Sequence, residues 1–158
     1  MRRAQLIILE SDGWIARQLA DLAAENRWLV RQPRSGDAAL SLARDARPTV
    51  LVVQVEPGDD KPAPFALIAD AHRLHPDVPA VAVSDVKLPD ADRAAWAALL
   101  FDLGARYVLF PPLSKSVLED VVSGLMASAA RRAAGLAPPP PAGGDGDVLD
   151  LADDDHDE

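Results

Sequence analysis

Short apolar runs alternate with amphipathic segments along the first 132 residues of the chain. The apolar runs are hydrophobic at consecutive positions, which is typical of strands in a sheet covered on both faces. They predict five strands, at residues 5–9, 28–32, 50–55, 80–84 and 106–110. After each strand, apolar residues recur at the spacing of a helix face. The five predicted helices lie at residues 14–26, 35–46, 65–75, 90–103 and from Ser114 or Ser116 to Arg132.

Polar residues and glycine mark several helix ends. Asp12 and Asp90 are the predicted N-caps of the first and fourth helices, because a carboxylate accepts hydrogen bonds from the free N–H groups of a first turn. Gly104 follows the fourth helix, where a left-handed residue commonly ends a helix. These signals agree with the predicted bounds.

Five strands that alternate with five helices predict an α/β fold, a doubly wound five-stranded parallel sheet between two layers of helices. In such sheets, ligands and reacting groups lie at the carboxyl ends of the strands. The residues that follow each strand are therefore the candidates for chemistry.

The composition changes after residue 132. Residues 133–147 form a linker rich in proline and glycine, and residues 148–158 form the acidic tail VLDLADDDHDE. The tail has too few apolar residues to fold alone. We therefore predict one domain at residues 1–132, followed by a linker and a disordered C-terminal tail.

The formal net charge of −9 is concentrated at the C-terminus, because residues 143–158 hold eight acidic and no basic residues. Neither part of the chain has the basic face that a phosphate backbone requires, so we expect no nucleic-acid partner. The chain has no cysteine, which excludes disulfides, thiolate metal sites and cysteine nucleophiles. The apolar run at residues 6–9 is too short for a signal peptide or membrane span. We predict a cytoplasmic protein that does not bind membranes.

The strand-end residues and the stretch LGARYVLFPPLS, which starts at Leu103, resemble the receiver domain of bacterial response regulators in order and spacing. The resemblance covers about residues 5 to 130. It implies a (βα)5 receiver fold, which is a flavodoxin-like three-layer sandwich. It also implies a role in two-component, or phosphorelay, signal transduction.

The resemblance assigns five residues of this chain to the family's phosphorylation pocket. Glu10 and Ser11 match the two acidic positions that help to hold Mg²⁺, and Gln54 matches the aspartate that accepts the phosphoryl group. Ser84 matches a serine or threonine of the family, and Pro111 matches its lysine. Of these five residues, only Glu10 and Ser84 fit the family's pattern.

Two further positions belong to the same resemblance. Val108 stands where the family has an aromatic switch residue. Pro112 matches the proline that follows the family's lysine, and the resemblance implies a cis bond before it, although such bonds are uncommon.

The departures remove what phosphoryl transfer requires. The amide of Gln54 is uncharged and is not the carboxylate nucleophile that forms an acyl phosphate. Ser11 offers Mg²⁺ no anionic oxygen, and Pro111 supplies no cation for phosphoryl oxygens. We predict that Gln54 fills the acceptor's space and makes local hydrogen bonds, and that the protein is a pseudo-receiver that is not an enzyme.

An alternative is a hydrolase-like site that uses a divalent cation and Ser84. Its carboxylates would come from two loops that follow strands, and the candidates are Glu10, Asp12, Glu56, Asp59 and Asp60. The glycine-rich signatures of nucleotide binding are absent from the sequence. We expect no cofactor and at most weak residual Mg²⁺ affinity.

The fourth predicted helix is apolar on most of its circumference. Ala94, Ala98 and Phe101 form one stripe, and a second stripe comprises Trp96, Leu99, Leu100 and Leu103. The second stripe either packs under a neighbouring element or forms an exposed patch. In receivers, the face of the fourth helix, fifth strand and fifth helix is the usual output surface. We therefore predict a protein-interaction face at the second stripe, for a signalling protein or a second copy.

Two more expectations concern partners. The acidic tail is predicted mainly to add solubility. The alternative is that its segment VLDL, which begins at Val148, adds a strand to a partner's sheet while the acids meet a basic rim. The chain as a whole is predicted to be an adaptor in bacterial signalling, or alternatively a decoy for a histidine kinase.

Overall fold

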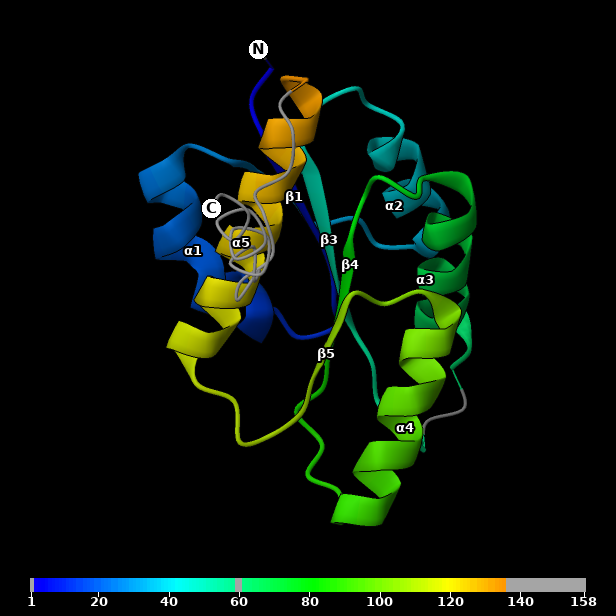
Figure 1. Cartoon of the computed structure of the whole chain (residues 1–158). Helices are drawn as coiled ribbons and strands as arrows, with labels where there is room; N and C mark the ends of the chain where they lie inside the picture. The colour runs from blue at the N-terminus through cyan, green and yellow to red at the C-terminus, as the bar shows by residue number, and fades with distance from the viewer. Residues whose placement is uncertain (1, 59–60, 136–158) are drawn as a thin grey trace, which may run out of the picture.

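The computed structural model describes residues 2–58 and 61–135, and the predicted tail lies outside them. One sheet holds five parallel strands in the order β2-β1-β3-β4-β5 (Figure 1). The strands are β1 (Gln5–Leu9), β2 (Leu29–Arg31), β3 (Thr49–Gln54), β4 (Ala80–Val83) and β5 (Tyr107–Leu109). The helices are α1 (Trp14–Asn26), α2 (Gly36–Ala43), α3 (Ala63–Leu74), α4 (Asp90–Leu103) and α5 (Lys115–Ala133).

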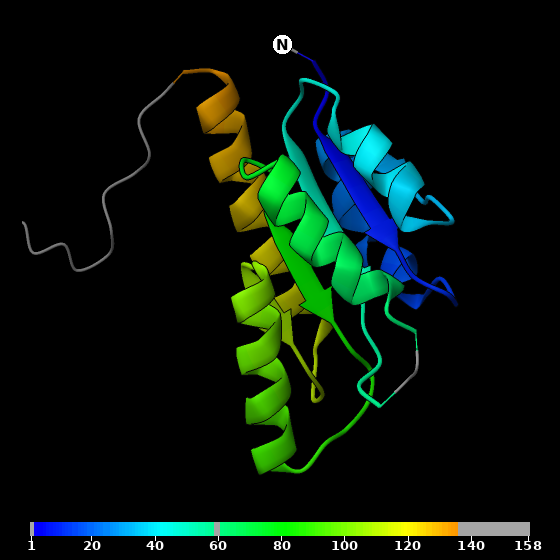
Figure 2. The same ribbon diagram turned by 90° about the vertical axis from the view of Figure 1, so that its right-hand side faces the viewer.

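The helices cover both faces of the sheet. α1 and α5 pack together on one face, and α2, α3 and α4 cover the other (Figure 1). Figure 2 looks onto the layer of α2, α3 and α4, with the sheet behind it. The predicted doubly wound, three-layer α/β fold is therefore confirmed.

β3 lies at the centre of the sheet, and all six of its residues are buried. Val50 and Val52 belong to the core cluster under α1 and α5. Leu51 and Val53 belong to the cluster under α2, α3 and α4. This division follows from the two-residue period of a strand, in which successive side chains point to opposite faces. Burial on both faces explains why β3 is apolar at consecutive positions.

Most bounds are close to those predicted, and two helices differ by more. α2 ends at Ala43 instead of residue 46, because Arg44 and Asp45 donate to the carbonyls of Ser41 and Leu42 in a tight turn. α3 begins at Ala63, two residues earlier than predicted. The reason is that Pro64 lies in the first turn, where a missing N–H costs no hydrogen bond.

The two predicted aspartate caps are wrong. α1 has Gly13 at its N-cap with φ of 79°, and α4 has Pro89 there, so Asp90 is already the first helical residue. The N-cap of α5 is Ser114, whose hydroxyl accepts from the N–H of Val117. Of the two serines predicted to begin this helix, Ser114 is therefore the cap.

No helix in the described part of the chain is both long enough and apolar enough to cross a membrane. The described residues also confirm Gly104 as the C-cap of α4, in the left-handed region with φ of 117°. A Cβ atom built at Gly104 would collide with the Cβ atom and ring of His72 on α3. Gly104 thus allows the end of α4 to approach α3.

We expect Gly104→Ala to lower the free energy of unfolding by about 1–3 kcal/mol, because alanine is strained at this φ and its methyl group meets His72. Gly124→Ala is the matched control. Gly124 lies within α5 with nothing within 4 Å of an added Cβ, so we expect this change to raise stability by up to about 1 kcal/mol. Urea denaturation of both variants measures the difference, and equal effects would contradict the packing described here.

Candidate functional site

Gln54 is the last residue of β3 and is 5% exposed. Its Oε1 atom accepts two hydrogen bonds from Ser11, one from the backbone N–H at 2.8 Å and one from the hydroxyl at 3.1 Å. The amide therefore ties the loop after β1 to the end of β3. The predicted local hydrogen bonding of Gln54 is confirmed.

The other atom of the Gln54 amide, Nε2, is buried and has no hydrogen-bond partner among the described residues. A buried donor without a partner costs about 1–3 kcal/mol, which offsets much of what two ordinary hydrogen bonds contribute. The net contribution of Gln54 to the free energy of unfolding is therefore small. Its position at the sheet edge places an uncharged group where the resemblance expects a carboxylate.

Glu10 has a structural role at the start of α1. One carboxylate oxygen accepts from the N–H of Ile15 at 2.8 Å, and the other accepts from the N–H of Ala16 at 2.9 Å. A negative charge at a helix N-terminus is favourable, and these bonds satisfy two N–H groups that have no partner within the helix. Glu10 thus supplies the cap that was predicted for Asp12.

Of the described carboxylates considered for a cation site, Glu10 and Glu56 line one hollow beside Gln54, and Asp12 does not join them. Asp12 is exposed, Glu56 is half-buried, and residues 59–60 lie outside the described part of the chain. In that part, no group of three or more histidine, aspartate or glutamate side chains is arranged to hold a metal ion. Because Glu10 uses both oxygens on α1, the described residues offer a hard cation no convergent set of ligands.

Ser84 lies at the end of β4 and is fully buried. Its hydroxyl accepts from the N–H of Val86 at 3.0 Å. The two described histidines, His72 and His75, lie in the last turn of α3 and at its C-cap, near the opposite edge of the sheet. Ser84 therefore has no histidine base beside it and acts as a satisfied polar group of the core.

Pro111 is half-buried in the loop after β5, and the Pro111–Pro112 peptide bond is cis, as predicted. Val108, at the position of the family's aromatic switch residue, packs half-buried against the core. The side of the pocket next to β5 is thus lined by apolar groups and contributes no cation.

Two basic residues border the other side of Gln54, and sequence reasoning did not consider them. Arg34 and Lys61 line a hollow of about 330 Å³ together with Gln54 and Glu10. Both basic side chains are on exposed residues, where charge interactions are screened by water and salt. They add positive charge near Gln54 but no nucleophile.

The predicted interaction face on α4 needs a correction. Leu100 is completely buried in the core, and Leu103 is half-buried against it. Trp96 packs on Phe65 of α3, with ring centroids 5.7 Å apart. Of the predicted stripe, Leu99 alone is largely exposed, at 44%. The stripe is mainly the inner face of α4, because this side of the helix packs against α3 and β5.

The exposed apolar surface lies on the neighbouring side of α4. Phe101 is 49% exposed, and Tyr107 on β5 is 45% exposed. A shallow groove of about 510 Å³, which we call the α4–β5 groove, runs between these elements. Its apolar lining includes Ala94, Ala97, Val108, Phe110, Pro111 and Pro112. The other apolar stripe, with Ala94 and Phe101, was the sequence signal for this surface.

Comparisons by sequence found no matching protein-family model and no matching curated protein. By structure, the chain is similar to solved receiver domains. A CheY-like response regulator receiver domain protein from Methanospirillum hungatei has 12% identity and a TM-score of 0.62, over 83% of this chain and 99% of that chain.

Two further receiver structures give the same result. The receiver domain of NtrX from Brucella abortus has 18% identity and a TM-score of 0.60, over 78% of this chain and 98% of that chain. A response regulator receiver domain protein from Clostridium thermocellum has 15% identity and a TM-score of 0.58, over 82% and 95%. At such identities the likeness shows the fold, which is the CheY-like receiver fold.

We expect Glu10→Ala to lower the free energy of unfolding by about 1–2 kcal/mol, because two N–H groups of α1 lose their acceptor. Asp12→Ala is the matched control, because it removes an exposed carboxylate two residues away and should change stability by no more than about 0.5 kcal/mol. Denaturant titrations provide the measurement. A larger loss for Asp12→Ala would show that the cap is assigned to the wrong residue.

Proposed function

We propose that this protein is a degenerate receiver domain that is not phosphorylated and acts as a protein-interaction module in two-component signalling. One observation carries the proposal. At the end of the central strand, where the receiver resemblance expects the phosphoryl-accepting carboxylate, Gln54 presents an amide whose oxygen is hydrogen-bonded to Ser11.

The surrounding groups support the same proposal. Glu10 uses both carboxylate oxygens to cap α1, and Ser11 donates to Gln54 instead of offering an anionic ligand. Pro111 has no cation for phosphoryl oxygens. Catalysis of phosphoryl transfer relies on positioned charges of these kinds. The pocket has neither the carboxylate nucleophile nor the second acid and lysine of the family, and the positive charge near Gln54 comes only from the exposed Arg34 and Lys61.

The described residues give less support to the hydrolase-like alternative. A metal-dependent hydrolase needs a bound cation and an activated water or hydroxyl. Ser84 is buried beside no histidine, and the carboxylates of the described loops do not converge. Interaction with another protein remains the function that the surface favours.

The proposed interaction surface is the α4–β5 groove together with two exposed aromatic residues on the same elements, Phe101 of α4 and Tyr107 of β5, which do not line the groove itself. Aromatic side chains bury large apolar areas and are enriched among residues that dominate binding energy. We take the partner to be another signalling protein, such as a histidine kinase or a true receiver, or a second copy of this chain. Because the pocket accepts no phosphoryl group, the surface is available constitutively.

We expect acetyl phosphate to leave no covalent phosphate on the protein in intact mass spectrometry, because Gln54 is not a carboxylate nucleophile. Beryllofluoride with Mg²⁺ should likewise leave the tryptophan fluorescence unchanged. A Mg²⁺-dependent spectral change, or a phosphorylated species, would overturn the proposal.

The positive control is the triple variant Ser11→Asp, Gln54→Asp and Pro111→Lys, which restores the family's residue types at the three departures. It should gain a Mg²⁺-dependent response to beryllofluoride, measured by the same fluorescence titration. Gln54→Asp alone should respond more weakly, because it still lacks the second acid and the lysine.

The interaction surface is tested by Phe101→Glu. Once a partner has been captured and purified, this variant should bind it at least about tenfold more weakly, since a charge replaces an aromatic anchor. Val30→Glu is the matched control, because Val30 on β2 is similarly exposed, at 40%, and lies at the opposite edge of the sheet. Equal losses in the two variants, measured by titration, would place the partner elsewhere.

A further inference from the structure

Positive charge gathers at the edge of the sheet where the strands begin. We call this region the basic end and define it as the segments that precede the strands and the last turns of the helices. The arginines at this end are Arg2, Arg3, Arg27, Arg44, Arg47, Arg73, Arg106, Arg131 and Arg132. The acidic residues in the same segments are Glu25, Asp45, Asp77 and Asp102. The basic end therefore has a clear excess of positive charge, although the whole chain is acidic. The expectation that the folded part has no basic face is thus wrong, because the fold brings together arginines that lie far apart in the sequence.

Among the described residues, the arginines of the basic end differ in their partners, and Arg73 pairs with Asp70 at 3.1 Å. Asp45 pairs with both Arg2 and Arg47, at 2.6 and 2.9 Å. In contrast, Arg3 donates to the backbone carbonyl of Arg27, and Arg132 donates to the backbone carbonyl of Asp77. A backbone carbonyl satisfies a donor but does not neutralise the guanidinium charge. The basic end thus keeps positive charge that an anionic segment would balance.

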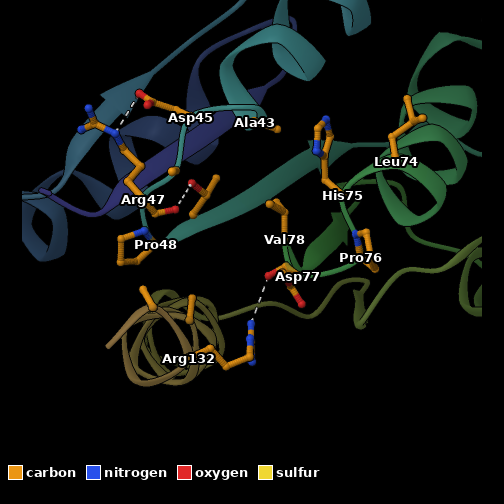
Figure 3. Close-up of a pocket in the computed structure, with 14 residues that line it drawn as sticks. Ala43, Asp45, Arg47, Pro48, Leu74, His75, Pro76, Asp77, Val78 and Arg132 are labelled. Carbon is orange, nitrogen blue, oxygen red and sulfur yellow. Dashed lines mark hydrogen bonds and ion pairs between the residues drawn. The ribbon is translucent and has the colours of Figure 1, made fainter. Parts of the chain in front are cut away.

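A hollow of about 460 Å³ opens at the basic end, between the loop before β3, the loop before β4 and the last turns of α5. Figure 3 shows Pro48, Leu74 and Val78 around it, together with the charged Arg47 and Arg132. The hollow therefore combines apolar walls with guanidinium groups at its margin. Such a surface fits a short apolar segment flanked by acids.

The sequence carries such a segment shortly after the end of α5. α5 ends at the basic end, on the same side of the molecule as the N-terminus (Figure 1), and Ala133 itself lines the hollow. Beyond the described residues, the sequence continues into residues 143–158, with eight acids and the apolar run VLDL at residues 148–151.

We propose that residues 143–158 dock on the basic end of their own domain, with residues 148–151 in the hollow and the acids on the surrounding arginines. The basic partner of the acidic tail is then the basic end of the same chain. It does not depend on the pocket at Gln54, which lies at the other edge of the sheet.

The connection between the two parts is long enough. Residues 136–147 span at most about 40 Å when fully extended, and the tether begins next to the hollow. Short flexible tethers hold a segment at an effective concentration on the order of 1 mM. In this tether the four prolines at residues 138–141 are stiff, and the glycines at residues 143, 144 and 146 supply the flexibility. A free acidic peptide or nucleic acid that binds the basic end equally well competes with the tail only when its concentration exceeds this effective concentration. The tail is therefore the favoured occupant.

The experiment uses the full chain, labelled with ¹⁵N and carrying Ala152→Cys as the attachment site of a nitroxide. The chain has no other cysteine, so the label is confined to the tail. In NMR spectra we expect loss of amide signal at residues 44–47, 75, 77–78 and 129–133, and no loss in the loop at residues 84–88. High salt should restore the signals, because it screens exposed charges. An absence of signal loss, or equal loss at both edges of the sheet, would overturn the proposal.

Paired charge reversals locate the contact. Arg44→Glu with Arg132→Glu should abolish the signal loss. The control, Arg17→Glu with Arg93→Glu, makes the same charge change near the other edge and should leave the loss intact. Leu149→Ser with Leu151→Ser should also abolish it, and persistence in this variant would refute insertion of the apolar run into the hollow.

A mixed sample separates docking within one chain from docking between copies. Spin-labelled protein without ¹⁵N is added to ¹⁵N protein without the label. Docking within the chain predicts no signal loss in this mixture, and a loss would assign the tail to a second copy. None of these experiments uses acetyl phosphate. A negative result would therefore overturn the docking of the tail without testing the proposal that the protein is not phosphorylated.

Discussion

The pairing of β3 with β1 on one side and β4 on the other determines where every candidate site residue lies. Leu9 pairs with Val53, and Gln54 pairs with Val83, so these three strands end at one edge. A shift of β3 by one residue would move each of its side chains to the opposite face of the sheet and displace Gln54 from its place beside the loop after β1. Gln54 is consequently held beside the loop after β1.

At that edge, the polar groups serve the fold more than chemistry. Glu10 closes the first turn of α1, Ser11 bonds to Gln54, and Ser84 bonds to the loop that follows it. Each group that resembles part of a phosphorylation pocket is therefore occupied by its own backbone or by a neighbour. If the pocket is degenerate as we propose, the sheet and its helices still supply the stability of the fold.

The two surfaces proposed for binding lie in different parts of the molecule and differ in chemistry. The α4–β5 groove is lined mainly by apolar residues, and the exposed Phe101 and Tyr107 lie on the same two elements. The basic end combines arginines with a partly apolar hollow. Arginines near helix C-termini are favoured by the helix dipole, which explains part of their placement. The two surfaces could therefore be used at the same time, one by a partner and one by the tail.

Sequence alone determined the order of strands and helices, the parallel sheet and the uncharged residue at the end of β3, because apolar periodicity and residue identity are local properties. The tertiary structure decided the rest. Gly13 takes a left-handed conformation, so Glu10 and not Asp12 reaches the first turn of α1. The rotation of α4 about its axis buries Leu100 and exposes Phe101, and contacts with α3 and β5 set that rotation. The hollow at the basic end is formed by the loop before β3, the loop before β4 and the last turns of α5, which only the folded chain brings together.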